Sequence, residues 1–157
     1  MKKVFLFLIL LSWLCFIGPS FLKADVKMPQ CIGNLSDWNN CRGALSKNLT
    51  SYVGEFKNSL PDGLGTFTYS DGATYHGYFK AGKEHGFGTF RCWQHGSEYV
   101  GEFKNGKKDG QGTYTYPDGV IYSGQWKFGK RHGSGKLTYL DGKITEGKFL
   151  DGRYIDK

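Results

Sequence analysis

A segment of about 23 residues recurs along most of the chain, and this repeat restricts the possible folds more than any other feature. The copies begin at Tyr52, Tyr75, Tyr99 and Tyr122, and a partial fifth copy begins at Thr145. A fixed period of this size is typical of stacked arrays, in which each unit buries its apolar surface against its neighbours. The sequence therefore predicts a cooperative ribbon of units, none of which is stable alone.

Within each unit, residues alternate between two faces with a period of two, which indicates β-strands. Tyr99, Gly101 and Phe103 share one face of the first strand, and Gly112 and Tyr114 share the corresponding face of the second. Asp-Gly between two such strands is a strong signal for a tight turn. The predicted fold is all-β, an elongated antiparallel ribbon of stacked β-hairpins, with an N-terminal signal helix if the leader is retained.

The glycines fall into two classes. Those of the Asp-Gly turns, Gly72, Gly119 and Gly142, are expected to supply positive φ angles. Those of the second class lie mid-strand between two aromatic residues, where the missing side chain leaves room for a ring from a neighbouring strand. A strand glycine costs roughly 0.5–1 kcal/mol, whereas a well-buried aromatic side chain returns about 2–3 kcal/mol. The predicted structural repeat residues are Tyr52, Gly54, Tyr75, Gly77, Tyr99, Gly101, Tyr122 and Gly124.

The beginning of the chain has the composition of a signal peptide. Lys2 and Lys3 precede a mostly apolar run from Val4 to Ile17, and cleavage is expected after Ala24. An uncleaved N-terminal anchor is the alternative. In both cases the rest of the chain is expected to be exported, to the periplasm or the extracellular space, in a location compatible with membrane association.

The chain is expected to contain three segments: a signal peptide over residues 1–24, a disulfide-containing cap over 25–40, and the repeat array over 41–157. The stretch that begins at Cys41 looks like the second half of one more unit. The array comprises unit one (52–74), unit two (75–98), unit three (99–121), unit four (122–144) and a partial unit (145–157).

The cysteines fit an oxidising compartment. Cys31 and Cys41 are predicted to form a small-loop disulfide, which would stabilise the fold by roughly 2–3 kcal/mol. Cys92 is then unpaired, either as a small buried apolar residue or as a site of intermolecular pairing. Although Cys92 and His95 have C-x-x-H spacing, His85 aligns with turn residues of other units, so no metal site is predicted.

The pattern Tyr-x-Gly-x-Phe/Trp, then Gly-x-Gly, then Asp-Gly closely resembles the MORN repeat. In unit three it is carried by Tyr99, Gly101, Phe103, Gly110, Gly112, Asp118 and Gly119. The resemblance spans about residues 40–155 and implies successive β-hairpins in a curved sheet that serves as a scaffold or membrane-associated module. Unit two departs from the pattern by one extra residue, which predicts a bulge near Cys92 and Trp93. Thr145 replaces the tyrosine in the last unit, as suits a terminal cap.

Basic residues recur at fixed positions of the units. Removing the three leader lysines from the 21 basic residues leaves 18 against 14 acidic residues, a mild net charge of +4. This charge suits an anionic surface, and export argues against nucleic acid. The alternative is that these lysines maintain solubility and protect sheet edges, partly neutralised by Glu55, Glu102 and Glu146. The candidate contacts are Lys57, Lys80, Lys104, Lys107, Lys108, Lys127, Lys130 and Arg131.

The sequence predicts a non-enzymatic binding or scaffold module that associates with an anionic membrane surface or a partner protein through these lysine rows. The alternative is binding of envelope polysaccharide through the aromatic face, although a repeated aromatic row is more often core. Open sheet ends favour homo-oligomers. No nucleophile–base set stands out, so no catalytic residue and no cofactor is predicted.

Overall fold

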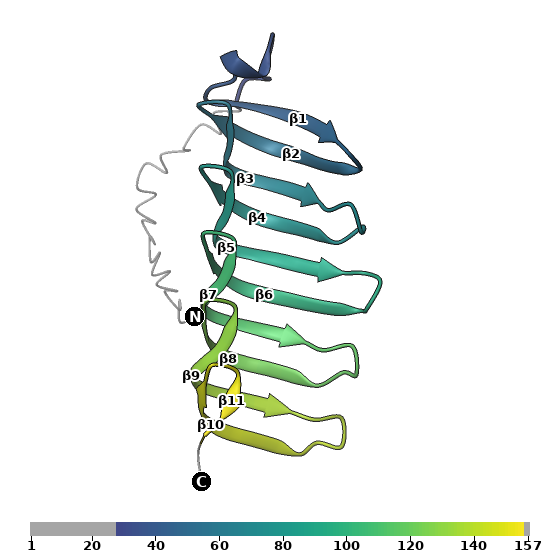
Figure 1. Cartoon of the computed structure of the whole chain (residues 1–157), viewed down its shortest axis with the longest axis vertical. Helices are drawn as coiled ribbons and strands as arrows, with labels where there is room; N and C mark the ends of the chain where they lie inside the picture. Colours follow the sequence, from purple (N-terminus) through teal and green to yellow (C-terminus); the bar gives the residue numbers. More distant parts are fainter. Residues whose placement is uncertain (1–27, 156–157) are drawn as a thin grey trace, which may run out of the picture.

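The structure is a computed structural model that describes residues 28–155. These residues contain one sheet of eleven antiparallel strands, which lie side by side in chain order and form an elongated ribbon (Figure 1). The predicted all-β fold is confirmed, whereas the predicted signal segment lies outside the described residues. The elements are a short 3-10 turn (Leu35–Asp37) and the strands β1 (Cys41–Lys47), β2 (Thr50–Lys57), β3 (Leu60–Thr68), β4 (Thr74–Lys80), β5 (Lys83–Cys92), β6 (Ser97–Lys104), β7 (Lys107–Thr115), β8 (Ile121–Lys127), β9 (Lys130–Thr138), β10 (Ile144–Leu150) and β11 (Arg153–Tyr154).

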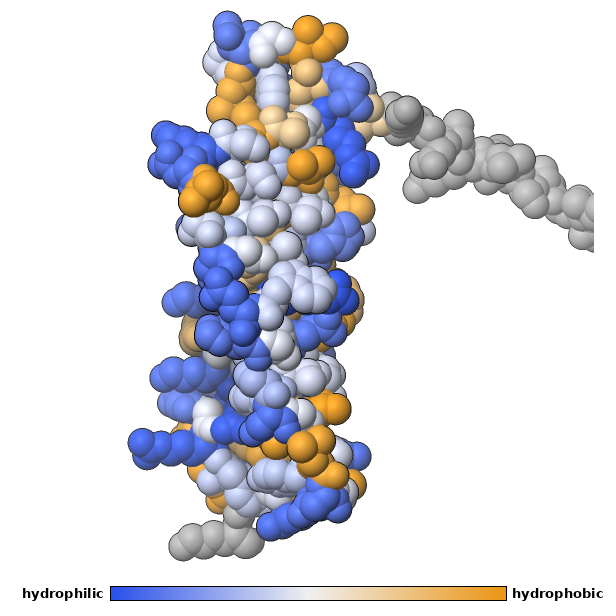
Figure 2. Space-filling view, turned by 90° about the vertical axis from the view of Figure 1, so that its right-hand side faces the viewer, coloured by the Kyte–Doolittle hydropathy of each residue, from blue (hydrophilic) through white to orange (hydrophobic). Residues whose placement is uncertain are grey.

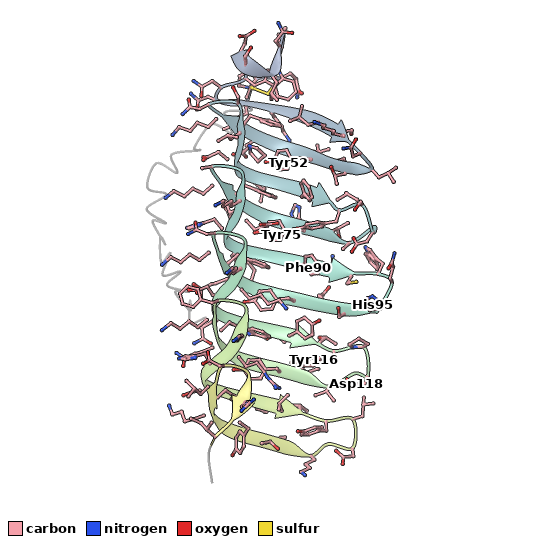
Figure 3. The ribbon with its side chains drawn as sticks, viewed as in Figure 1. Tyr52, Tyr75, Phe90, His95, Tyr116 and Asp118 are labelled. Atoms are coloured by element: carbon pink, nitrogen blue, oxygen red, sulfur yellow. A yellow bond between two sulfur atoms is a disulfide. The ribbon has the colours of Figure 1, made fainter. Side chains whose placement is uncertain are left out.

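Two kinds of turn alternate along the chain. Within each unit, two residues with positive φ connect the strands, as at Asn105 and Gly106 with φ angles of 51° and 78°. Two consecutive left-handed residues are the signature of a type I′ turn, whose twist matches that of a hairpin. Longer connections, of which all but that between units two and three contain Asp-Gly, join successive units on the opposite edge of the ribbon, where Asp118 lies (Figure 3). The predicted positive φ of Gly72, Gly119 and Gly142 is confirmed.

The tyrosine that opens each full unit is buried above a pair of glycines. Gly101 of β6 pairs with Gly112 of β7, and a Cβ atom on either glycine would overlap the side chain of Tyr99. The Tyr99 hydroxyl then donates a 2.9 Å hydrogen bond to the carbonyl of Glu102. The predicted gap is therefore confirmed, but the prediction that a neighbouring strand supplies the ring is wrong. The ring comes from the same strand as Gly101 and extends over the partner glycine on the neighbouring strand.

The buried rings form a continuous column along the ribbon, and Tyr52 and Tyr75 lie one above the other in it (Figure 3). Tyr75 contacts Phe79 of its own unit and Phe103 of the next unit, with ring centroids 5.1 and 4.8 Å apart. Both contacts are edge-to-face, an arrangement worth about 0.5–1.5 kcal/mol beyond area burial. The predicted core role of the unit-opening tyrosines is confirmed, because Tyr75, Tyr99 and Tyr122 are 0% exposed.

A bulge lies beside the glycine pair within each full unit. In unit three the ladder is regular as far as Gly101 opposite Gly112 and resumes at Phe103 opposite Lys108, so β7 carries the extra residues. The φ of Gly110 within this bulge is 109°. The same register shift occurs in units one, two and four.

The prediction of a bulge near Cys92 and Trp93 is wrong. Strands β5 and β6 pair without a register shift as far as Cys92 opposite Ser97. The extra residue of unit two lies instead in the turn over residues 93–96, which the structure assigns to no strand. A longer turn accommodates the residue without breaking any ladder hydrogen bond, whereas a bulge would interrupt the sheet.

The N-terminal cap is held as predicted by a disulfide between Cys31 and Cys41. Cys41 opens β1 and lies opposite Phe56, the place that Gly63 takes opposite Phe79 one unit later. Strand β1 is therefore the second half of an incomplete unit, as the sequence indicates.

Candidate binding surfaces

The within-unit turns share one long edge of the ribbon, and lysines flank three of them on both sides. Lys80 lies directly opposite Lys83 across the turn between β4 and β5. Lys57 precedes the turn of unit one and faces Leu60. All these lysines are exposed. The lysine edge, as we call it, consists of Lys57 and the pairs Lys80–Lys83, Lys104–Lys107 and Lys127–Lys130.

The lysine edge has no carboxylate partner within residues 28–155. None of its seven lysines forms an ion pair with another described residue. Two like charges directly opposite each other on a sheet destabilise it. The edge therefore concentrates unpaired positive charge at a cost to the fold.

One of the glutamates that the sequence expects to neutralise this charge, Glu102, has another role. A side-chain oxygen of Glu102 accepts a 2.8 Å hydrogen bond from the backbone N–H of Gln111 in the bulge. Gln125 makes the equivalent bond to Ser134 in the next unit. Because the uncharged Gln125 makes the same kind of bond, Glu102 acts here as a hydrogen-bond acceptor for the bulge, and its charge is not required for that bond.

Asp109, just behind the lysine edge, connects one unit to the next. Its carboxylate accepts the backbone N–H of Phe128 at 3.2 Å, and the carbonyl of Lys108 accepts the N–H of Gly129 at 2.8 Å. Asp62 makes the equivalent bond to Ala81 at 3.0 Å. Each within-unit turn is thus hydrogen-bonded to the preceding unit.

Two of the candidate anion contacts lie elsewhere, on the aromatic face of the sheet. The Lys108 ammonium lies 3.9, 5.0 and 5.1 Å from the ring centres of Tyr114, Trp126 and Tyr99. Burial lowers the pKa of Lys108 from its ordinary value of 10.5 to about 8. The Arg131 guanidinium also lies over rings and donates to the carbonyl of Gly152 at 2.6 Å. These two side chains are committed to the protein's own aromatic face.

A cavity of about 230 Å³ opens on the aromatic face where units two and three meet. Three aromatic rings, one carboxylate and two lysines contribute to its walls. It is lined by Tyr69, Glu84, Phe90, Phe103, Gly106, Lys107, Lys108 and Gly129.

A family model for the MORN repeat matches the chain at residues 52–74, 75–92, 99–121 and 122–144, together more than half of its length. The chain belongs to the MORN repeat family. No curated protein matches it closely enough to count as a relative. MORN repeats are in general non-catalytic binding or scaffold modules, and the hairpin array described above is consistent with that role.

Other side chains of the MORN array that sequence reasoning considered as ligands lie apart. Cys92 is unpaired and half-buried at the end of β5, whereas His95 is exposed at the turn that follows. Within residues 28–155, no three His, Cys, Asp or Glu side chains gather in a way that could hold a metal ion. The described part of the chain also has no helix long and apolar enough to cross a membrane.

The edge that joins successive MORN units presents isolated hydrophobic residues. Leu49, Trp93 and Leu140 are 87, 68 and 79% exposed, and hydrophobic side chains form separate patches on this edge (Figure 2). Scattered apolar residues of this kind are normal on protein surfaces. The lysine edge and the cavity are therefore the better candidates for binding.

Sequence reasoning missed two features of these surfaces. It aligned the lysines in a row but did not pair them across the turns, although Lys-x-x-Lys around a two-residue turn was visible at Lys104 and Lys107. It also grouped Lys107 and Lys108 as equivalent loop residues. The period-two rule, which places neighbours on opposite faces of a strand, would have separated them.

Proposed function

We propose that this MORN array is a non-enzymatic binding ribbon that associates with an anionic membrane surface through the lysine edge. The observation that carries the proposal is the set of three opposed lysine pairs without an ion pair. An anionic surface would relieve the repulsion within every pair at once. The apolar leader supports export, which would put this surface on the outer side of a membrane.

Protection of the sheet edges against pairing with another chain does not explain the position of these lysines. The strand edges that could recruit another chain are those of β1 and β11, at the two ends of the sheet, whereas the lysine edge runs along the turns. Two strands per unit place successive pairs roughly 10 Å apart, about one Debye length at physiological salt. Each lysine near an anionic surface contributes about 1 kcal/mol, so a row of pairs supports salt-sensitive binding.

Co-sedimentation with vesicles tests the proposal. The triple variant Lys80→Gln, Lys104→Gln, Lys127→Gln should bind vesicles containing phosphatidylserine roughly 100-fold more weakly than the unmodified chain, from about 1 kcal/mol per lysine. The matched control replaces Lys47, Lys136 and Lys143, three exposed lysines outside the lysine edge, and should bind nearly as the parent does. The proposal would be overturned if vesicle binding depended on neither lipid charge nor salt concentration. It would also be overturned if the control variant lost as much vesicle binding as the triple variant.

The test also separates other occupants. An acidic partner protein would use the same lysines but would be retained without vesicles. A polysaccharide would have to stack on the outer aromatic row, such as Tyr114 and Tyr116, because the unit-opening tyrosines are buried. Stacking survives high salt, so salt-resistant glycan retention that is lost in Tyr114→Ala would favour that alternative.

A further inference from the structure

One position on the aromatic face has a different residue in each unit. This position pairs with the second aromatic residue of the unit's first strand, which is Phe103 in unit three. It lies just before the bulge and faces a box of aromatic rings. In unit three, Lys108 occupies it and the box is Tyr99, Tyr114 and Trp126. The residues at this position are Pro61, Glu84, Lys108 and Arg131.

In units three and four the chain's own cation fills the box. The Lys108 ammonium lies 3.9 Å from the nearest ring centre. The Arg131 guanidinium lies 5.3 Å from the ring centre of Phe149 and 5.7 Å from that of Tyr122. A cation over ring faces is attracted by their negative quadrupole, most strongly where water is excluded. Units three and four therefore show that this box accommodates a cation.

In unit two an acid replaces that cation. The Glu84 carboxylate accepts a hydrogen bond from the Tyr69 hydroxyl, and no described residue forms an ion pair with it. Burial first, and the Glu84 charge second, raise the pKa of Tyr75, the buried tyrosine of the same unit. The box thus combines ring faces with a carboxylate, two features that attract a cation, and lacks the cation that completes it elsewhere.

The cavity of about 230 Å³ lies at this box and is bounded by Glu84, Phe90 and Phe103. Lys107 and Lys108 also line it, and neither is ion-paired with Glu84. The exposed Lys107 would repel a purely cationic ligand, such as a lysine of a partner protein, at the mouth. A zwitterion fits both charges, with its ammonium group against the rings and Glu84 and its anionic group toward Lys107.

We propose that this cavity binds a phosphoammonium group of the phosphocholine or phosphoethanolamine type. The ammonium lies in the unit-two box between Phe90, Phe103 and the Glu84 carboxylate, and the phosphate lies at the mouth beside Lys107. The site is on the aromatic face and requires no net negative surface. It is therefore separate from the lysine edge, with which it shares only Lys107.

Calorimetric titration of the full chain tests the proposal with three probes: phosphocholine, choline and inorganic phosphate. Phosphocholine should bind at least tenfold more tightly than either of the others. Glu84→Lys should abolish binding and still fold, because it fills the box as Lys108 fills the next one. Glu146→Lys makes the same charge change on an exposed strand position and should bind like the parent. Glu84→Gln should weaken binding about tenfold.

Several results would overturn the proposal: equal binding of choline and phosphocholine, unchanged binding in a folded Glu84→Lys variant, or tighter binding of N-acetyl-lysine methylamide, which would indicate a basic peptide. Net-neutral phosphatidylcholine vesicles distinguish the two sources of the ligand. Retention that is lost in Glu84→Gln identifies a lipid headgroup, whereas binding of soluble phosphocholine alone identifies a free metabolite.

The two proposed sites can fail independently. The triple variant Lys80→Gln, Lys104→Gln, Lys127→Gln should retain phosphocholine binding, and Glu84→Gln should retain binding to phosphatidylserine vesicles. Loss of phosphocholine binding in the triple variant would overturn the separate cavity site.

Discussion

Within residues 28–155, each end of the ribbon has a neighbouring unit on one side only, and other residues replace the missing neighbour to different degrees. At the N-terminal end, a Cβ atom on Gly43 would lie 2.8 Å from the Trp38 ring and 3.0 Å from the Cys31 sulfur. These two side chains cover Gly43 as a tyrosine covers the glycines of later units. Trp38 also contacts Phe56 edge-to-face at 4.8 Å, the same separation as that between Tyr75 and Phe103.

The hydrogen bonds at the N-terminal end reproduce those between units. The Asn39 side chain accepts the backbone N–H of Asn58 at 3.1 Å, and the Trp38 carbonyl accepts that of Ser59 at 2.8 Å. Asp109 and Lys108 make the same two bonds to the turn of unit four. The cap is thus a compact substitute for a whole preceding unit, and the disulfide holds it in place.

The C-terminal end is closed less completely. Strand β11 has two residues, Arg153 and Tyr154, and Tyr154 is 43% exposed although its ring contacts Phe149 at 5.4 Å. Thr145, where full units have a buried tyrosine, is half-buried, in line with the smaller apolar surface expected of a terminal cap. The difference between the ends predicts that the ribbon frays from its C-terminus, because local stability follows buried apolar contact.

The largest expected effect comes from removing the ring that replaces a neighbour. Trp38→Ala uncovers Gly43 and one face of Phe56, and should lower the free energy of unfolding by about 3–5 kcal/mol. Urea denaturation followed by tyrosine fluorescence measures this loss. Trp93→Ala is the control, because Trp93 is 68% exposed and should change stability by less than about 0.5 kcal/mol. Equal losses would show that Trp38 is not part of the closure.

The second prediction removes the covalent link at the same end. Replacing both Cys31 and Cys41 with alanine should cost about 2–3 kcal/mol, mainly by increasing the entropy of the unfolded chain. Reduction of the unmodified protein should give a similar loss. A hydrogen-exchange map should show the loss of protection concentrated in β1 and β2, whereas uniform loss along the ribbon would contradict a local cap.

The repeat and its alternation predicted the hairpins, their order and the buried tyrosines, because each of these follows from a pattern of period two inside one unit. The bulge beside the glycine pair was not predicted, because the period-two alternation of a regular strand carries no signal for the extra residues in β7. The closure by Trp38 was missed for a related reason. A single tryptophan outside the period carries no alignment, and its equivalence to a tyrosine emerges only when the chain folds back on Gly43.

The third prediction compares two hydroxyl groups. The Tyr122 hydroxyl donates to the Gln125 carbonyl at 2.9 Å, and the Tyr154 hydroxyl donates to the Glu146 carbonyl at 3.1 Å. Tyr122→Phe leaves a part-buried carbonyl without its donor and should cost about 1–2 kcal/mol. Tyr154→Phe should cost less than about 0.5 kcal/mol, because water reaches the exposed end. Thermal unfolding of both variants measures the difference, and similar losses would imply that the C-terminal end is as well closed as the interior.

The smallest expected effect is a pH dependence located in the C-terminal half. With a pKa of about 8 in the folded state and 10.5 ordinarily, Lys108 binds fewer protons in the folded chain than in the unfolded chain between these values. Stability should therefore rise with pH from about 8. Above about pH 10 the trend reverses, because burial raises the pKa of tyrosines such as Tyr99 in the folded state, and unfolded tyrosines ionise first.

Lys108→Arg isolates this contribution, because an arginine remains charged throughout the range. Urea midpoints at pH 7, 8, 9 and 9.5 should rise modestly for the parent, since Lys108 is only half-buried and solvent screens part of the effect, and should stay level for the variant. The disulfide and Trp38 carry no group that titrates in this range, so the same slope should persist in Trp38→Ala. If the rise of the urea midpoint with pH persisted in Lys108→Arg, another group would be titrating. The assignment of the pH dependence to Lys108 in the C-terminal half would then be wrong.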